Sequence, residues 1–243
     1  MNKLKYFPTS PPKIFFKKKC NEELAKYKKN LFELQNIFYA DNRFALLIIF
    51  QGVDTAGKDG SIRHVMTSMN PMGVNVKSFK LPTEEEAGHD FLWRVYPHFP
   101  AKGIIEVFNR SYYEDILVPS IEKTLPKENI EHRCQLINSL EQHLELSNTH
   151  VLKFFLHISK EEQEKRNKER LTQPHKGWKY TKEDEAAADK WDDYMKVYDM
   201  LVNKCNEHPW HIIPADKRWY RNFAVAKVLT NHLQSLHLKF PQS

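Results

Sequence analysis

The chain has 243 residues, 41% hydrophobic and 28% charged, a composition typical of a globular protein with one sizeable core. No run reaches the roughly 18 apolar residues of a membrane span, and the N-terminus lacks the features of a signal peptide, so we expect a cytoplasmic protein. The excess of 37 Lys and Arg over 31 Asp and Glu gives a net charge of +6, which suggests an anionic partner but does not choose among nucleic acid, phosphate polymers and nucleotides.

The three cysteines, Cys20, Cys134 and Cys205, are odd in number and far apart in the chain. A disulfide framework or a zinc site needs closer and more regular spacing. The segment HRC at 132–134 holds a single His–Cys pair, which is more typical of a helix surface than of a metal site. The cysteine pattern therefore favours neither disulfides nor zinc.

The first segment, residues 1–20, carries Pro8, Pro11 and Pro12 and is predicted to be an extended lead-in. It ends in three lysines at 17–19, most simply interpreted as a solvated face, with a phosphate-contacting arm as the alternative. Residues 21–39 place apolar side chains three and four residues apart, which predicts an amphipathic helix.

Five apolar runs follow and alternate with segments of helical periodicity. The runs cover residues 44–50, 74–80, 103–109, 150–158 and 210–215. The helical segments lie near 59–69, 84–96, 112–124, 128–147, 159–171, 182–206 and 218–236. This alternation predicts a single α/β domain over 1–243, with a parallel sheet of about five strands in a three-layer arrangement. The carboxyl ends of parallel strands meet at one edge, where we expect the ligands.

The segment 160–206 differs from the rest because it is highly charged and is interrupted by TQPHKG at 172–177. We interpret it as a helical lid inserted before the last strand; a solvent-exposed helical hairpin is the alternative. Trp191, Tyr194 and Tyr198 lie at helical spacing within it. Their spacing favours packing of the lid over a platform for stacking a base.

One apolar run leads into a glycine-rich loop, in ALLIIFQGVDTAGKDGS at 45–61. Its frame resembles the phosphate-binding loop between a strand and a helix, but an acid follows the lysine where Ser or Thr is usual. Glycines let the backbone approach an anion closely, and the helix N-terminus favours negative charge. We expect Lys58 to contact phosphate and Asp59 to cap the helix N-terminus, where a carboxylate is favoured. Asp54 is expected to ligate magnesium, which prefers oxygen ligands. The other loop residues expected to contact phosphate are Gly52, Val53, Thr55, Ala56, Gly57, Gly60 and Ser61, together with Asp59.

A second signal is IIEVFNRSYYEDILV at 104–118, a strand that turns into a helix. The strand beside a phosphate loop usually ends in an acid that holds magnesium, but here the position carries Asn109. Arg110 follows, and an arginine at a strand end can clamp a phosphate. Either Glu114 or Asp115, further along, is expected to supply the missing carboxylate.

The loop GVDTAGKDG and the segment FNRSYYE resemble motifs of the polyphosphate kinase type 2 family. Further similar segments lie at 70–94, 151–166, 178–199 and 209–222, so the resemblance spans about 52–228. It implies a thymidylate-kinase-like P-loop kinase fold with a helical lid. It also implies reversible transfer of a terminal phosphoryl group between inorganic polyphosphate and nucleoside mono-, di- or triphosphates, with Mg²⁺ or Mn²⁺, in a dimer or tetramer.

The resemblance also implies roles for individual residues of the two motifs. Asp54 would hold magnesium, with Glu114 as a second candidate ligand. Lys58 would bind the transferred phosphoryl group, and Arg110 would clamp phosphate. All four are therefore candidate catalytic residues.

Four further basic residues are candidates outside those motifs. Arg166 and Arg170 match lid arginines that close over the site and are also candidate catalytic residues. We expect Arg166 to lie near the solvent. Lys80 matches a basic residue along the path of the polymer. Arg63 is grouped with Lys58, Lys80 and Arg110 as a candidate contact to polyphosphate.

The sequence leaves alternatives open for the phosphoryl acceptor and for the phosphoryl donor. The segment GKDG, and Glu114 within FNRSYYE, resemble the branch of the family that accepts both AMP and ADP. An ATP-dependent nucleoside monophosphate kinase on the same fold is one alternative, and it would need a second base pocket. A non-catalytic nucleic-acid-binding module would use the positive charge, but it needs no lysine in a glycine loop and no groove-reading motif is present. We therefore expect neither nucleic acid nor a membrane as a partner.

Overall fold

The computed structural model describes residues 4–172 and 190–242. Its centre is a five-stranded sheet in the order β2-β3-β1-β4-β5, and every neighbouring pair is parallel. The strands are β1 (Ala45–Gln51), β2 (Val74–Ser78), β3 (Ile105–Asn109), β4 (Thr149–His157) and β5 (Trp210–Pro214). The predicted parallel α/β sheet, including all five strand positions, is confirmed.

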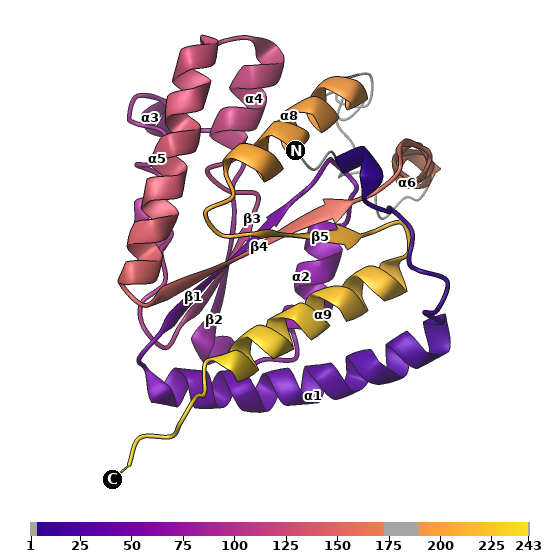
Figure 1. Cartoon of the computed structure of the whole chain (residues 1–243), viewed down its shortest axis with the longest axis vertical. Helices are drawn as coiled ribbons and strands as arrows, with labels where there is room; N and C mark the ends of the chain where they lie inside the picture. The colour runs from indigo at the N-terminus through magenta and orange to yellow at the C-terminus, as the bar shows by residue number, and fades with distance from the viewer. Residues whose placement is uncertain (1–3, 173–189, 243) are drawn as a thin grey trace.

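Helices cover both faces of this sheet and make three layers (Figure 1). One face carries α1 (Lys17–Asp41), α2 (Lys58–Met66) and α9 (Arg218–Ser235), with α1 packed along α9. The other face carries α4 (Glu114–Glu122), α5 (Lys127–Leu146) and α8 (Trp191–Lys204). The helix α6 (Lys160–Thr172) follows β4 at the edge where the strands end. The predicted 182–206 helix is observed from Trp191, and its first part, with the rest of 173–189, lies outside the described residues.

The sequence of β1 explains its central position. All seven of its residues are buried, as a strand covered by helices on both faces requires. Its neighbours β3 and β4 are also almost wholly buried, whereas β2 at the edge is largely accessible. The apolar core therefore runs through the middle of the sheet and ends at the phosphate loop that follows β1.

The segment 84–96 does not form the long helix that its sequence suggested. The helix α3 (Glu84–Ala87) begins at a capping box between Thr83 and Glu86 and ends at Gly88. The Asp90 carboxylate then accepts a hydrogen bond from the Leu92 amide, which stabilises a turn in place of a helix. The segment closes with a short 3₁₀ turn, η3 (Tyr96–His98).

The described part of the lead-in, residues 4–16, contains the short turn η1 (Leu4–Tyr6) and no other helix or strand, and it is held against the domain. The Leu4 amide donates to the Asp199 carboxylate at 2.6 Å, and the Leu4 side chain is buried. The Ser10 hydroxyl donates to the Asp216 carboxylate at 2.9 Å, and the Asp216 amide donates to the Thr9 carbonyl. The lead-in thus passes beside the ends of β4 and β5.

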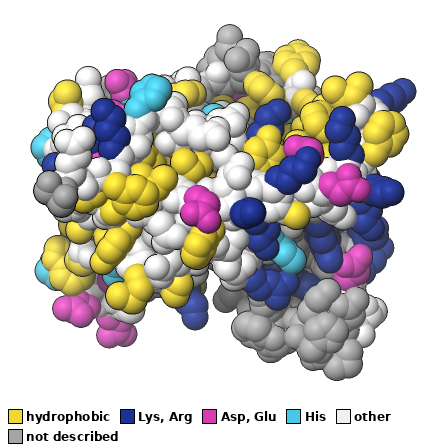
Figure 2. Space-filling model, turned by 90° about the horizontal axis from the view of Figure 1, so that it is seen from below, with side chains coloured by type: hydrophobic (Ala, Val, Ile, Leu, Met, Phe, Trp, Pro, Cys, Tyr) yellow, Lys and Arg dark blue, Asp and Glu magenta, His cyan; other side chains and the backbone are white. Residues whose placement is uncertain are grey.

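The surface carries its positive charge unevenly. On the face seen in Figure 2, most of the Lys and Arg side chains lie on the half where α1 and α9 begin, which is also the half toward which the strands run. The three lysines at 17–19 lie in the first turns of α1 and are exposed. Within the described residues, no helix is both long enough and apolar enough to cross a membrane.

Candidate active site

The predicted phosphate loop lies between the end of the central strand and the start of α2, which begins at Lys58. Gly57 adopts a φ of 103° and Gly52 a φ of 149°, and a Cβ atom on Gly52 would come within 2.8 Å of the Leu156 carbonyl oxygen. The loop residue Thr55 also has a positive φ, 65°. This conformation folds the loop tightly against the N-terminus of a helix, a position that attracts anions.

Lys58 is held within the loop. Its side chain is buried, with 7% of its surface exposed, and its Nζ atom donates to the carbonyls of Gly52 at 2.7 Å and Val53 at 3.3 Å. Burial lowers the pKa of Lys58, and the negative charge of Asp54 opposes that shift. A positive charge that is desolvated and bonded mainly to carbonyl oxygens interacts strongly with any phosphate that reaches the loop.

Asp54 and Arg110 form an ion pair at 2.6 Å, with both side chains partly accessible. Arg110 comes directly after β3 with a φ of 63°, and its amide donates to the Phe50 carbonyl of the neighbouring strand. Burial acts to raise the pKa of Asp54, but the positive charges of Lys58 and Arg110 outweigh it and hold the pKa below its ordinary value. Asp54 is therefore ionised at neutral pH.

The structure distinguishes between the two carboxylates at the start of α4. Glu114 lies close enough to Arg110, Lys58 and Asp54 for their charges to influence it, and burial raises its pKa. Asp115 instead pairs with Arg94 at 3.1 Å, away from the loop. Glu114 is therefore the carboxylate that joins the cluster.

The residues at this cluster fit a magnesium ion. No group of three or more His, Cys, Asp and Glu side chains gathers as a metal site in the described part of the chain. Magnesium is commonly held by one or two carboxylates together with phosphate oxygens, so Asp54 and Glu114 suffice as protein ligands. Buried side-chain oxygens of Gln51, Thr55 and Ser61 lack a hydrogen-bond partner, as expected in a polar site built for a ligand.

Asn109 and Asp59 bind each other across the site. The Asn109 amide nitrogen donates to the Asp59 carboxylate at 2.9 Å and to the Ser78 hydroxyl at 3.3 Å. Asp59 lies in the first turn of α2, where a carboxylate is favoured by the helix dipole. The contact ties α2 to the ends of β3 and β2.

Arg166 lies in a different place from the one we expected. It is 5% exposed instead of lying near the solvent, and its Nε atom pairs with Glu162 on the preceding turn of α6. Its two terminal nitrogens donate at 2.7–3.0 Å to the carbonyls of Thr55, Ala56, Ala215 and Asp216. A guanidinium has five donors in a fixed plane, so one arginine joins the phosphate loop to the segment after β5.

The other predicted basic residues are distributed around the cluster. Arg170 is half-buried, and its charge contributes to the lowered pKa of Asp54. Arg63 on α2 and Lys80 after β2 are exposed, outside the buried cluster. The Lys80 carbonyl accepts a hydrogen bond from Arg94, the residue that pairs with the start of α4.

Three contributors to the site were not predicted from the sequence. Gln163 donates to the Asp54 carbonyl at 3.3 Å, and Tyr198 on α8 is buried beside Glu114 and Arg110, whose charges influence it. Tyr198 also packs on Phe155 of β4, which agrees with the predicted packing role. The third is Arg221 on α9, which contacts the phosphate loop. Its only signal in the sequence is its place in PADKRWYRN, one of the segments that resemble the family.

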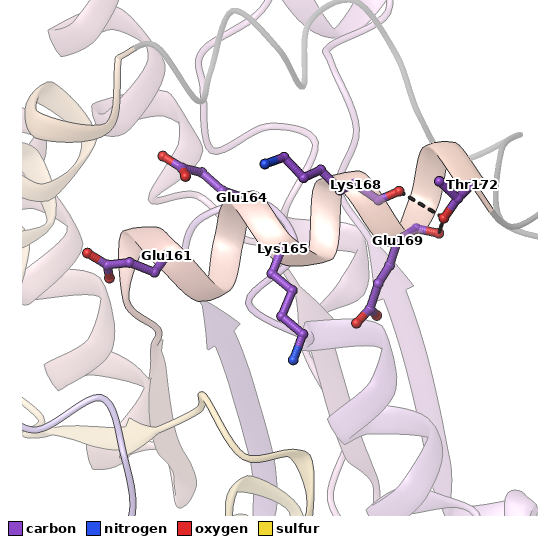
Figure 3. A pocket seen from close by; sticks show the side chains of 6 residues that line it. All are labelled: Glu161, Glu164, Lys165, Lys168, Glu169 and Thr172. Carbon is purple, nitrogen blue, oxygen red and sulfur yellow. Dashed lines mark hydrogen bonds between the residues drawn. The ribbon is translucent and has the colours of Figure 1, made fainter.

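A separate hollow of about 450 Å³ lies on the outer face of α6. Figure 3 shows that its lining side chains all come from this one helix and that Thr172 bonds back to the carbonyls of Lys168 and Glu169. The acidic and basic side chains alternate there, as on an ordinary solvated helix face. None of the predicted site residues lines it.

Comparison with known proteins identifies the family of the chain. Residues 15–241 match the model of the family described as Polyphosphate kinase 2. The AMP/ADP-polyphosphate phosphotransferase of Meiothermus ruber is 41% identical over 223 residues, covering 91% of this chain and 84% of the relative. The ADP-polyphosphate phosphotransferase of Rhodopseudomonas palustris is 39% identical over 252 residues, covering 98% and 87%.

A solved structure agrees with the fold. The crystal structure of Polyphosphate Kinase 2 from Arthrobacter aurescens TC1 superimposes with a TM-score of 0.93 at 40% identity, covering 98% of this chain and 86% of that one. The fold is that of the P-loop kinases, as the resemblance implied. The family match extends over almost the whole chain and includes every residue of the cluster. The chain belongs to the polyphosphate kinase 2 family.

Proposed function

We propose that this protein transfers the terminal phosphoryl group of inorganic polyphosphate to nucleoside mono- and diphosphates, and that the reaction is reversible. The observation that carries the proposal is the cluster of Lys58, Arg110, Asp54 and Glu114 at the phosphate loop of a polyphosphate kinase 2 chain. The name of the Meiothermus ruber relative supports both acceptors. The positive half of the surface in Figure 2 suits two polyanionic substrates.

The chemistry requires bringing two negatively charged chains together in line. An oxygen of the acceptor phosphate attacks the terminal phosphorus of the polymer, and the bridging P–O bond breaks, so the polymer leaves one phosphate shorter. The acceptor oxygen is already an anion, so the site needs charge neutralisation and alignment more than it needs a strong base. Lys58 and Arg110 supply fixed positive charge at the loop, and Arg170 lies beside them.

We propose that Asp54 and Glu114 hold Mg²⁺, with Mn²⁺ as a substitute. The ion would neutralise charge on the phosphates that develops in the loose transition state of phosphoryl transfer. The ion pair of Arg110 with Asp54 occupies one carboxylate oxygen, which leaves the other for a ligand. Lys80 and Arg63, both exposed, are proposed contacts for the length of the polymer beyond the site.

We further propose that residues 160–206 act as a lid, that the protein works in the cytoplasm and that it assembles as a dimer or tetramer. Two described parts of the lid segment support the first proposal, because Arg166 and Gln163 on α6 and Tyr198 on α8 reach the loop or the cluster. The three cysteines are free thiols, which suits a reducing compartment.

The test supplies ADP and long-chain polyphosphate to the purified protein without ATP and follows ATP and AMP. We expect ATP to form without accumulation of AMP, and AMP supplied in place of ADP to yield ADP and then ATP. Equal amounts of ATP and AMP would show disproportionation of ADP, the reaction of a nucleoside monophosphate kinase. No turnover with either acceptor at any Mg²⁺ concentration would contradict the proposed function.

A further inference from the structure

Arg221 is a buried arginine on α9 that reaches the phosphate loop from a distant part of the chain. It is 2% exposed. Its Nη1 atom lies 3.4 Å from the Ala56 carbonyl, and its Nε and Nη2 atoms donate to the side-chain oxygen of Asn222 at 3.2 and 2.9 Å. These are neutral partners, so the hydrogen bonds leave its charge uncompensated.

The surroundings of Arg221 are positive. Arg166 pairs with Glu162 and Arg218 pairs with Glu169, but no described carboxylate forms an ion pair with Arg221. Burial and the charges of Arg166 and Arg218 lower the pKa of Arg221 to about 9, so it remains protonated at neutral pH. A buried charge without a counter-ion is rare in proteins because it is costly, and such residues are concentrated at functional sites.

Two glycines of the loop are shaped to admit this guanidinium. A Cβ atom on Gly57 would stand 1.8 Å from Nη1 of Arg221, and one on Gly60 would stand 2.9 Å from Nη2. Gly57 has a positive φ and would favour glycine in any case. Gly60 lies within the first turn of α2, outside the positive φ region, where alanine is the better helix former. A Cβ atom at this position would therefore require the Arg221 guanidinium to shift.

We propose that Arg221 is a positioning residue for phosphate binding: packed against the backbone at Gly57 and Gly60, it holds the loop in shape and adds a positive charge that the bound phosphate chain neutralises. Its guanidinium lies against the loop backbone at Ala56, Gly57 and Gly60, so it acts through the loop. The inference rests on the proposed function in so far as polyphosphate is the phosphate chain in question.

The test compares Arg221→Gln, which removes the charge, with Arg221→Lys, which keeps it. We expect the Gln variant to lower kcat/KM for polyphosphate by on the order of tenfold, as for one charge acting across a few ångströms of protein. The KM for ADP should change little, and the Lys variant should recover part of the loss. A merely structural role would lower both variants alike and would leave the KM for polyphosphate unchanged, which would overturn the proposal.

A binding measurement separates this inference from the proposed function. Tripolyphosphate should raise the melting temperature of the wild type more than that of Arg221→Gln, whether or not the protein turns over polyphosphate. Equal shifts would overturn the role of Arg221 even in an active enzyme. An inactive wild type that nevertheless shows the difference in shift would contradict the proposed function alone.

A double-mutant cycle tests the contact between Arg221 and Gly60 directly. Gly60→Ala should lower the activity of the wild type because its Cβ displaces the guanidinium, but it should have little effect on top of Arg221→Ala, which vacates that space. Gly88→Ala is the matched control, because its Cβ would meet neighbours at ordinary contact distances of 3.4 and 3.6 Å. An equal effect of Gly60→Ala in both backgrounds would contradict the contact on which the proposal depends.

Discussion

Replacing Lys58 with methionine tests whether the loop lysine serves catalysis or the fold. The substitution keeps most of the aliphatic length of the side chain and removes the charge. In the structure the Nζ atom donates to two loop carbonyls, and Asp54 is close enough to oppose the shift that burial imposes on its pKa. The wild-type residue is therefore a charge placed in a desolvated position with little compensation from the protein.

The contribution of Lys58 to folding stability and its contribution to catalysis differ in size and in sign. Because the pKa of Lys58 is lowered in the folded state, its charge disfavours folding at neutral pH, and this cost disappears as the pH rises from the folded pKa toward the unfolded value of 10.5. Lys58→Met removes this cost and so gains stability, but it also loses the two hydrogen bonds, which costs about 0.5–1.5 kcal/mol each. We therefore expect the free energy of unfolding to change by no more than about 2 kcal/mol. A fixed cation on the transferred phosphoryl group is worth about 10³–10⁵ in rate, or about 4–7 kcal/mol in the barrier.

The assay measures kcat with polyphosphate and ADP at saturation, and urea unfolding on the same preparation. We expect Lys58→Met to lose at least about 10³-fold in kcat while unfolding at nearly the wild-type urea concentration. Lys26→Met is the control, because Lys26 is 71% exposed and its one ion pair among the described residues is with Glu23 on its own helix. Lys58→Met with wild-type turnover would refute the catalytic role, and a variant that unfolds before it loses turnover would make Lys58 a structural residue.

Two further predictions concern the stability of the elements around the site. Glu141 and Lys153 form a fully buried ion pair at 2.6 Å. Glu141→Gln leaves the buried charge of Lys153 unpaired, so it should lower the free energy of unfolding by about 3–5 kcal/mol in urea titrations. A loss below about 1 kcal/mol would contradict this expectation. Asp216→Asn should lower stability by about 1.5–3 kcal/mol, because Asp216 accepts hydrogen bonds from Ser10 and Ser159. The pKa of Asp216 is lowered despite burial, so the difference from wild type should be full above pH 3.8 and should disappear as the pH falls through the folded pKa. A difference that persists at lower pH would contradict the role of the carboxylate.

The sheet could be predicted from the sequence because its strands are covered on both faces. Such strands appear as continuous apolar runs, and the runs at 44–50 and 150–158 correspond closely to β1 and β4. The segment 84–96 shows the limit of this approach. Its helical periodicity did not account for the competing side-chain bond of Asp90 or for a glycine directly after Ala87. Local hydrogen bonds of this kind decide where a helix ends, and periodicity does not register them.

The loop and its immediate partners were also predictable, since a glycine frame that ends in lysine between a strand and a helix is a specific signal of phosphate binding. The sequence could not decide between Glu114 and Asp115. Adjacent residues at the start of a helix point in different directions, and Arg94, the partner of Asp115, is distant in sequence. Arg166 was misplaced for a similar reason. A charged side chain in a charged segment suggests solvent, but a guanidinium surrounded by four carbonyls can be buried.

The two departures from the usual phosphate-loop pattern lie at residues that contact each other. In most such loops a hydroxyl follows the lysine and an acid ends the neighbouring strand, and both help to hold magnesium. Here Asp59 follows the lysine and Asn109 ends the neighbouring strand. The Asn109 side-chain amide donates a hydrogen bond to the Asp59 carboxylate at 2.9 Å. This contact makes a polar link between the loop helix and β3, and it occupies one carboxylate oxygen of Asp59 with an amide donor. The carboxylates that we propose as metal ligands lie elsewhere: Asp54 in the loop pairs with Arg110, and Glu114 on α4 lies close enough to Lys58 and Arg110 for their charges to influence it.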